Sequence, residues 1–428
     1  MSDTEFNIDT SKLTPANQNP WYILMTLYGE QEGDEIDWEL HEKNRQAWNA
    51  WSCQHKTKKE RDELSNVAII PSFELEYNCE TEKRISALFY ENYTKRNNSK
   101  LSIEAPDSRE PVKFNNTYFH RNLILERFVF SSAFIFQENL ILSRSNLVSC
   151  CFSEYADFSG SIFLNQSEIQ RSKFFDDAIF YKCRFSNISF HGCKFENKSE
   201  FMDAIFTDKA DFAYTNFLGE AIFFSAVFGI ETVFSHSNFY SRADFGFSQF
   251  GSPSKKNSIR FQECHFFAPT SFNNTAFILS YPIFSSALLH EYTYFSAFSQ
   301  LWPNINIRTQ PPHLSRDSCA VIRHILTKQG RPEDAHFFFR REMSYARQVG
   351  PIWQRSPYIL YGWLSDFGYS ILRPTVCLSL LWIIGFALIA SGLEATQQYL
   401  RPLATAAALS FSNVTAQVVG FRPSEDWA

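Results

Sequence analysis

Residues 210–253 read ADFAYTNFLGE AIFFSAVFGIE TVFSHSNFYSR ADFGFSQFGSP, four successive blocks of eleven residues. Each block has a small residue first, an aromatic residue third, a small residue sixth and an aromatic residue eighth. The aromatic residues are alternately five and six residues apart, which fits neither the 3.6-residue period of a helix nor the two-residue period of a strand. Short extended faces separated by corners fit this spacing. The repeat therefore predicts a solenoid whose large side chains point toward its axis.

The same frame extends over residues 112–303, where its third and eighth positions hold 26 of the 45 Phe of the chain. The block at 178–187 is one residue short, and residues 254–258 are inserted, so we expect a corner loop at the insertion. Stacked turns would align the rings in columns. The predicted repeat core consists of Phe158, Phe163, Phe174, Phe180, Phe185, Phe190, Phe195, Phe201, Phe206, Phe212, Phe217, Phe223, Phe228, Phe234, Phe239, Phe245, Phe250, Phe261 and Phe266.

Three strings of the repeat resemble a known family: Ala156-Asp157-Phe158, Ala210-Asp211-Phe212 and Ala243-Asp244-Phe245. A small residue, an Asp and a central Phe, with alternating five- and six-residue steps, are similar to the Phe-centred variant of the pentapeptide-repeat proteins. The resemblance implies a mainly β fold, a right-handed quadrilateral β-helix with four faces per turn. Seven to eight turns at a strand spacing of ~4.8 Å would make a rod of roughly 35 to 40 Å.

Residues 1–111 are predicted to form an N-terminal cap, partly helical, because an open solenoid end exposes unpaired backbone. Residues 37–51 have the pattern of an amphipathic helix with Leu40, Ala47, Trp48 and Trp51 on its apolar side. Asn19-Pro20-Trp21-Tyr22 resembles the leader of membrane-anchored members of the family. The cap region is acidic, with 13 basic against 21 acidic residues.

A helical hairpin is expected over 304–350, because two helical patterns there are separated by Gly330-Arg331-Pro332, with Gly placed as a C-cap and Pro at a helix start. It would either pack on its own domain or bind partner helices. Residues 351–374 then form a juxtamembrane segment, and residues 394–428 form the C-terminal segment.

Residues 375–393 contain no charged residue and are predicted to form a transmembrane helix, since nineteen residues reach roughly 28 Å. A buried core helix is the alternative. Arginines cluster upstream, among them Arg340 and Arg373, whereas Arg401 alone follows closely. The positive-inside rule therefore places the solenoid in the cytoplasm. The polar, acidic N-terminus has no signal-peptide pattern. We expect a bacterial inner-membrane protein.

Known catalytic and nucleotide-binding motifs do not occur in the sequence, so we expect no enzyme activity, no cofactor and no metal. Nine Cys without a CxxC pair favour reduced thiols. Cys150, Cys183, Cys193 and Cys264 share the sixth repeat position with Ser, Thr and Ala, which indicates small core residues. We expect His191, His236 and His265 on the outer surface. The carboxylate pairs Asp176-Asp177 and Glu333-Asp334 are expected to point apart or to offset a helix dipole.

These observations favour a membrane-tethered, non-catalytic interaction scaffold that presents flat faces to a protein partner. A first alternative is a transport or channel component acting through the C-terminal region, where residues 410–421 resemble in part a potassium-channel pore loop without its Thr-Val-Gly-Tyr-Gly string. A second alternative is DNA mimicry acting on a topoisomerase, as some relatives of the fold do. That role needs a strongly acidic rod, whereas residues 112–303 hold 15 basic and 17 acidic residues. Nucleic acid is therefore not an expected partner.

Overall fold

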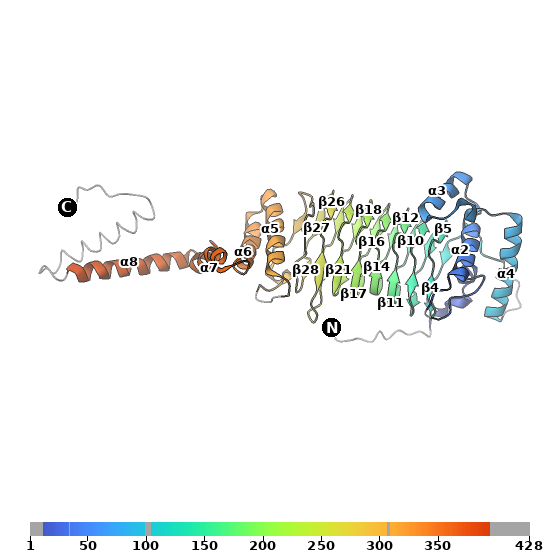
Figure 1. The fold of residues 1–428 in the computed structure, drawn as a ribbon, viewed down its shortest axis with the longest axis horizontal. Coiled ribbons are helices and arrows are strands. Elements are labelled where there is room, and N and C mark those ends of the chain that lie inside the picture. Colours follow the sequence, from blue (N-terminus) through green and yellow to red (C-terminus); the bar gives the residue numbers. More distant parts are fainter. Residues whose placement is uncertain (1–11, 34, 99–103, 306–308, 394–428) are drawn as a thin grey trace. The chain divides into compact units, whose positions relative to one another are not determined.

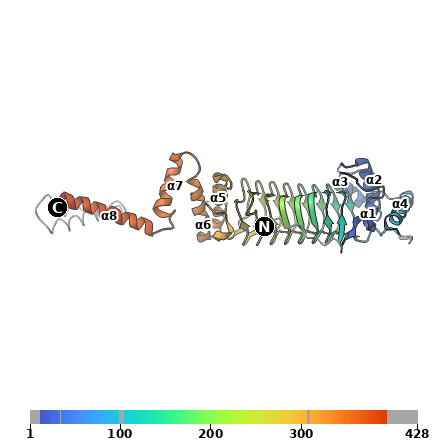
Figure 2. The same cartoon turned by 90° about the horizontal axis from the view of Figure 1, so that it is seen from below.

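The computed structural model describes residues 12–33, 35–98, 104–305 and 309–393, and for residues 388–393 it describes the backbone alone. The chain divides into two compact units, residues 1–339 and 340–428, which are treated separately below. The predicted C-terminal segment, residues 394–428, lies outside the described residues. Figures 1 and 2 show that the first unit is a stack of coils made of short β-strands, with helices at both ends of the stack.

The stack is a parallel β-solenoid of about eight turns whose strands form three sheets. The first sheet has thirteen strands: β1 (Thr14–Pro15), β3 (Thr117–Phe119), β4 (Leu123–Ile124), β7 (Leu140–Ile141), β8 (Ser145–Asn146), β11 (Ile162–Glu168), β14 (Arg184–Ser189), β17 (Ile205–Asp211), β20 (Val227–Phe228), β21 (Glu231–Val233), β24 (Gln249–Phe250), β25 (Ser258–Arg260) and β28 (Ala276–Phe277). The second has nine: β2 (Val112–Lys113), β6 (Phe134–Ile135), β10 (Ala156–Asp157), β13 (Ala178–Ile179), β16 (Ser199–Glu200), β19 (Ala221–Ile222), β23 (Ala243–Asp244), β27 (Thr270–Phe272) and β29 (Tyr294–Phe295). The third has seven: β5 (Val129–Phe130), β9 (Cys151–Phe152), β12 (Lys173–Phe174), β15 (Lys194–Phe195), β18 (Asn216–Phe217), β22 (Asn238–Phe239) and β26 (His265–Phe266).

One turn of the solenoid takes two eleven-residue blocks. Ser199 in β16 pairs with Ala221 in β19, and Phe217 in β18 pairs with Phe239 in β22, each 22 residues further along the chain. All strand pairs in the described solenoid are parallel and join equivalent positions of neighbouring turns. The predicted β-solenoid is therefore confirmed as a mainly β, parallel fold.

Phe residues fill the interior in columns. Phe201 stacks on Phe223 with ring centroids 4.8 Å apart and 4° between the planes, and Phe223 stacks on Phe245 at 4.9 Å and 2°. Phe212 lies edge-on to the Phe223 column at 5.4 Å and 87°. Each Phe of the predicted repeat core is at most 3% exposed in the structure. Burial of so much aromatic surface is the main stabilising contribution to the rod.

The corners of the solenoid are tight turns at the fifth residue of each block. Tyr214, Ser225 and His236 have φ values of +58°, +58° and +60°. Within the turn, the N–H of Thr215 donates to the carbonyl of Phe212 at 3.3 Å. A positive φ at this place is typical of a type II turn, which favours Gly, yet among the fifth positions of the described repeats Gly occurs only at 160 and 192. Stacking of the turns thus imposes a conformation that local preference does not favour.

The two irregularities of the repeat lie at its surface. The short block is absorbed in β14, whose register with β17 shifts between Phe185 and Asn187. The inserted residues form a turn that ends where β25 begins at Ser258.

The N-terminal helices cover one end of the solenoid: η2 (Ala16–Gln18), α1 (Pro20–Met25), α2 (Trp38–Ser52), α3 (Lys58–Ala68), η3 (Ser72–Leu75) and α4 (Cys79–Asn97). Strand β5 is the edge of the third sheet, and α2 supplies partners for its backbone. The Nε1 of Trp48 donates to the carbonyl of Val129 at 2.9 Å, and Asn49 Oδ1 accepts from the N–H of Val129 at 2.8 Å. The cap therefore satisfies the exposed sheet edge. On α2, Trp48 and Trp51 are buried as expected, whereas Leu40 is only half-buried.

At the opposite end lie η4 (Ser299–Leu301), α5 (Pro312–Lys328) and α6 (Pro332–Ala346), of which residues up to Phe339 belong to the first unit. Trp302 stacks on Phe277 at 4.8 Å and meets the edge of Phe338 at 4.8 Å. Gln329 Nε2, just beyond α5, donates to the carbonyls of Glu291 and Thr293 at 2.7 Å. These helices close the last turn of the solenoid.

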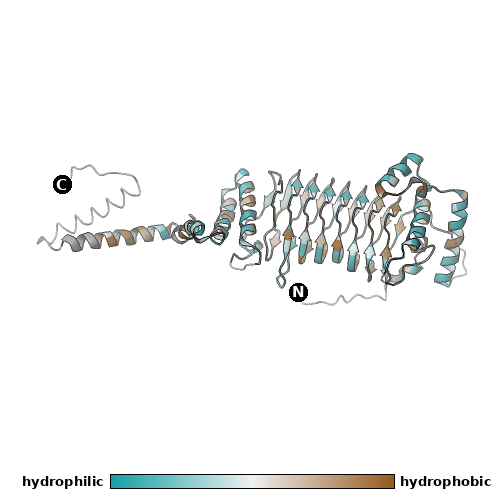
Figure 3. Ribbon diagram, viewed as in Figure 1, coloured by the Kyte–Doolittle hydropathy of each residue, from teal (hydrophilic) through white to brown (hydrophobic). Residues whose placement is uncertain are grey.

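The second unit contains the end of α6, then α7 (Ile352–Ser365) and α8 (Leu372–Leu393). Helix α7 occupies most of residues 351–374, the segment predicted to be juxtamembrane. Brown segments in Figure 3 mark apolar residues of α8.

The structure does not support the predicted transmembrane helix over 375–393. The chain is helical there, but no helix within the described residues combines the length and the apolar character needed to cross a membrane.

Candidate functional site

The four Cys at the sixth repeat position are buried in the solenoid wall. Cys150 Sγ donates to the carbonyl of Leu125 at 2.7 Å, and Cys264 Sγ donates to that of Phe234 at 2.8 Å. Burial raises the pKa of the Cys193 and Cys264 thiols to about 12. A thiol that stays protonated, faces no solvent and is already hydrogen-bonded is a poor nucleophile. These Cys are structural residues.

The sixth position has a role that its small size alone did not indicate. Ser237 Oγ donates to the carbonyl of Phe212 in the preceding turn at 2.6 Å and accepts from the N–H of Thr215 at 3.2 Å. Thr215 Oγ1 makes the equivalent bond to the carbonyl of Phe190 at 2.9 Å. Ser, Thr and Cys at this position thus form a ladder of side-chain hydrogen bonds along the rod. In the sequence, this role is indicated by Ser, Thr or Cys at the sixth position more often than Ala, because their short side chains can donate a hydrogen bond.

The remaining sequence candidates do not come together. His191 and His265 are half-buried, and His236 lies at a corner beside Glu263, with Nδ1 3.3 Å from Oε2. Asp177 Oδ1 accepts from the N–H of Lys198 at 3.2 Å, and Asp334 pairs with Arg331 at 2.6 Å at the start of α6. Across the described residues, no group of three or more His, Cys, Asp or Glu is arranged to hold a metal ion.

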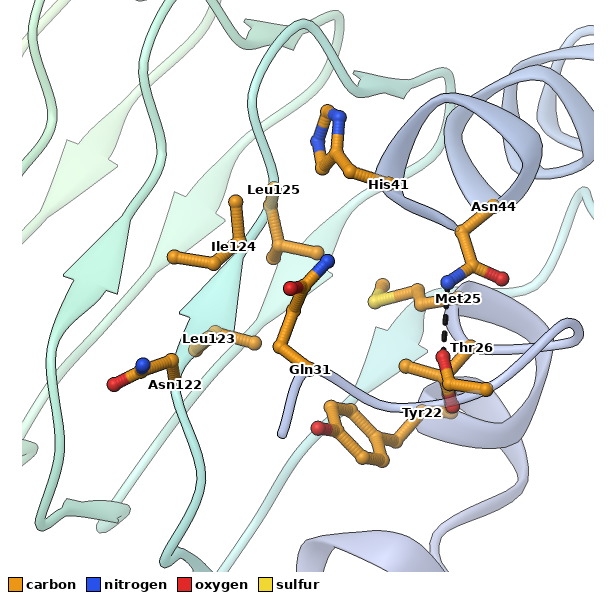
Figure 4. Close-up of a pocket in the computed structure, with 11 residues that line it drawn as sticks. Tyr22, Met25, Thr26, Gln31, His41, Asn44, Asn122, Leu123, Ile124 and Leu125 are labelled. Carbon is orange, nitrogen blue, oxygen red and sulfur yellow. Dashed lines mark hydrogen bonds between the residues drawn. The ribbon is translucent and has the colours of Figure 1, made fainter. Parts of the chain in front are cut away.

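A small cavity lies between the N-terminal cap and the first turns of the solenoid (Figure 4). Its volume of about 20 Å³ has room for about one water molecule. His41 lines it from α2, and Asn44 donates to the carbonyl of Gly29 at 2.9 Å. Burial, with the positive charges of Arg45 and Arg127, lowers the pKa of His41 to about 4. The cavity fits a structural water beside a neutral imidazole and is too small for an organic ligand.

The outer side of the third sheet and the corner that leads into it carry a cluster of exposed aromatic side chains. We call it the aromatic patch, and it consists of Tyr214, His236, Asn238, Tyr240 and Phe267. Tyr214, Tyr240 and Phe267 are 52%, 50% and 53% exposed. Tyr214 lies at the corner before β18, whereas Tyr240 and Phe267 directly follow β22 and β26, and the three strands are adjacent in the sheet. Large aromatic side chains held on a flat, rigid face are typical of interaction surfaces.

Contacts within the patch order its side chains. Tyr214 stacks on His236 with centroids 4.5 Å apart and 11° between the rings, and Tyr240 stacks on Phe267 at 4.9 Å and 7°. Between these two stacks, the amide of Asn238 donates to Asn216 Oδ1 at 2.9 Å. The patch therefore consists of two stacked pairs of aromatic rings separated by one amide–amide hydrogen bond. Such an array offers apolar contact and hydrogen bonds with little loss of side-chain entropy.

Some of the same positions are charged in earlier turns. Glu196 precedes Tyr240 by two turns in the outward column, and it binds Lys173 at 3.0 Å and Lys194 at 2.8 Å. The change from an ion-pair network to exposed aromatic rings occurs along one continuous sheet. The sequence did not predict the patch, because the repeated spacing specifies the inward Phe and leaves the outward positions unconstrained. Aromatic residues at outward positions of the repeat, such as Tyr240 and Phe267, would have indicated the patch.

Comparisons with family models, with curated proteins and with solved structures found no match to the chain. The repeat of Phe at every fifth or sixth residue and the parallel solenoid of about eight turns are consistent with a pentapeptide-repeat fold. The class of protein defined by the fold is thus a β-solenoid with helical caps.

Proposed function

We propose that this protein is a non-catalytic interaction scaffold, in which the aromatic patch binds a protein partner and the C-terminal helices hold the rod at a membrane. In this proposal the solenoid is the right-handed quadrilateral β-helix of the pentapeptide-repeat proteins and faces the cytoplasm of a bacterium. The observation that carries the proposal is the stacked, half-exposed pair Tyr240 and Phe267 on a flat sheet face.

The energetic argument favours a protein partner. Exposed aromatic rings gain free energy when they are covered, and Tyr is enriched among the residues that contribute most to protein interfaces. The rings of the patch are already held by stacking, so binding would cost little additional ordering. The buried, hydrogen-bonded state of the repeat thiols supports a structural role for the interior.

Site-specific photocrosslinking of the full chain in its own cells tests this proposal. We expect a benzophenone amino acid at Phe267 to give a discrete adduct with a protein, and Tyr240→Ser to reduce that adduct at least about tenfold. Phe247 is the matched control, since it is 54% exposed at a corner between the other two sheets. Equal adducts from positions 247 and 267, or no protein adduct from 267, would refute the patch as the binding surface.

A further inference from the structure

Helix α7 carries an exposed apolar stripe, which we define as Trp353, Leu360 and Trp363. Their side chains are 84%, 56% and 69% exposed. Spacings of seven and ten residues place all three on one side of the helix. Trp353 and Trp363 are among the most exposed large residues of the described chain.

The opposite side of α7 is partly in contact with its own unit, and Tyr358 on that side remains 36% exposed. The carbonyl of Gly362 accepts from Arg373 Nη1 at 3.3 Å, and a Cβ at Gly362 would lie 2.7 Å from Cζ of Phe367. Tyr361 packs edge-on against Phe367 at 5.7 Å, and Arg355 Nε donates to the carbonyl of Arg347 at 2.7 Å. These contacts hold the helix with the stripe turned outward.

The unit that carries the stripe has a net positive charge. Residues 340–387 contain five Arg and two carboxylates, a net charge of +3. One of these carboxylates, Asp366, is paired with Arg340 at 2.5 Å, and α7 itself contains Arg355 and no acidic residue. A cationic unit with outward Trp and Leu side chains complements a surface that is both apolar and anionic.

We propose that α7 lies in the headgroup region of an anionic lipid bilayer, with Trp353, Leu360 and Trp363 directed toward the acyl chains. Trp is suited to this depth because its ring is largely apolar and its N–H remains near water. Exposed apolar residues continue at Ile371 and Leu372, which are 83% and 73% exposed, so the surface available to lipid extends into α8. This inference rests on the membrane attachment in the proposed function and identifies its lipid-contacting element and the lipid class.

Flotation of the full chain with vesicles tests the assignment. We expect binding to vesicles of phosphatidylcholine with phosphatidylglycerol, and at least about tenfold weaker binding to phosphatidylcholine alone. The double variant Trp353→Gln/Trp363→Gln is expected to bind the anionic vesicles at least about tenfold more weakly than the wild type. Trp38→Gln is the matched control, because Trp38 is 54% exposed in the N-terminal cap, and its binding should stay within about twofold.

Thermal unfolding and sedimentation of the same variants distinguish a loss of lipid contact from a change in folding or in oligomeric state. Unchanged unfolding temperature and oligomeric state, together with lost vesicle binding, support the lipid assignment. Wild-type affinity in the double variant, or equal wild-type binding to neutral and anionic vesicles, overturns it. A lowered unfolding temperature would show that another part of the chain covers the stripe, and loss of an oligomer would show that a second copy does.

The scaffold proposal and the lipid assignment can fail independently of each other, because different experiments test them. Photocrosslinking from Phe267 tests the partner surface without lipid, whereas flotation with purified protein needs no partner. If the double variant still sediments with cell membranes, the attachment stands and α7 is not its element.

Discussion

Phe212 and Trp353 are both large aromatic residues, yet one is fully buried in the solenoid and the other is 84% exposed in the second unit. The contrast extends to their surroundings, since Phe212 lies within a column of parallel rings and Trp353 lies on an open helix side. Apolar composition alone therefore does not say where a side chain lies. In the solenoid, backbone geometry returns every turn to the same register and buries its Phe. In α7, the outward side has no neighbour within the described part of its unit, so only a lipid, a partner or another part of the chain could bury it.

The largest expected effect comes from placing a charge inside the solenoid. Phe212→Asp would remove a ring that is 0% exposed and bury an unpaired carboxylate, which we expect to cost at least about 5 kcal/mol. That is comparable to the whole stability of a typical domain, so the variant should lose its β-sheet circular dichroism.

Phe247→Asp is the control, because Phe247 is 54% exposed at an outer corner. Its unfolding free energy should stay within about 0.5 kcal/mol of the wild type. Similar losses in both variants would mean that the rings of the frame are not the element that holds the rod together.

The buried imidazole of His41 in the N-terminal cap should make the stability of the folded protein depend on pH. The pKa of His41 is about 4 in the folded protein and about 6.5 when unfolded, so between these values the unfolded chain binds more protons. Stability should therefore fall as the pH drops from about 6.5 to about 4, by up to about 3 kcal/mol in total.

Urea unfolding at several pH values, followed by Trp fluorescence, measures this effect. His41→Phe should weaken the pH dependence in that window, since it removes the imidazole whose protonation is suppressed by burial and by the charges of Arg45 and Arg127. An unchanged pH profile in the variant would place the protonation elsewhere.

The hydrogen-bond ladder in the wall should give a smaller effect. Ser237→Ala removes the bonds to the carbonyl of Phe212 and from the N–H of Thr215, at a cost of about 1 kcal/mol. Ser235→Ala, at a half-buried position two residues earlier, is the control. Ser237→Cys should cost less than Ser237→Ala in the same unfolding experiment, because Cys makes the equivalent bond at position 264.

The smallest effect is expected on the open side of α7. Trp353→Gln should change the unfolding free energy by no more than about 0.5 kcal/mol, since the indole is already in contact with solvent. Trp48→Gln, by contrast, removes a fully buried ring and its bond to Val129 and should cost several kcal/mol. Thermal unfolding of both variants in the absence of lipid makes the comparison. A large loss of unfolding free energy in Trp353→Gln would mean that Trp353 is packed in the folded protein, as Trp48 is, and would contradict the contrast between the two regions.

The sequence by itself determined the solenoid, because one repeated spacing of Phe and small residues admits few backbone paths that bury every ring. It also determined the caps in outline, from the helix pattern at 37–51, from Gly330 after α5 and from Pro332 at the start of α6. It did not determine the left-handed corners at Tyr214 and Ser225, since those φ values are imposed by the stacking of turns against local preference. Nor did it determine that the sixth position bonds to a carbonyl 25 residues earlier, as Ser237 does.

Only the tertiary structure decided what lies on the outside. The aromatic patch exists because residues about 22 to 30 positions apart become neighbours when turns stack, as Tyr240 and Phe267 do. The stripe on α7 became visible only when the packed side of the helix, against Phe367 and Arg373, was known. A repeat specifies its interior because every turn must satisfy the same packing. Its outer surface is free of that constraint, so side-chain placement there depends on which turns and helices the fold brings together.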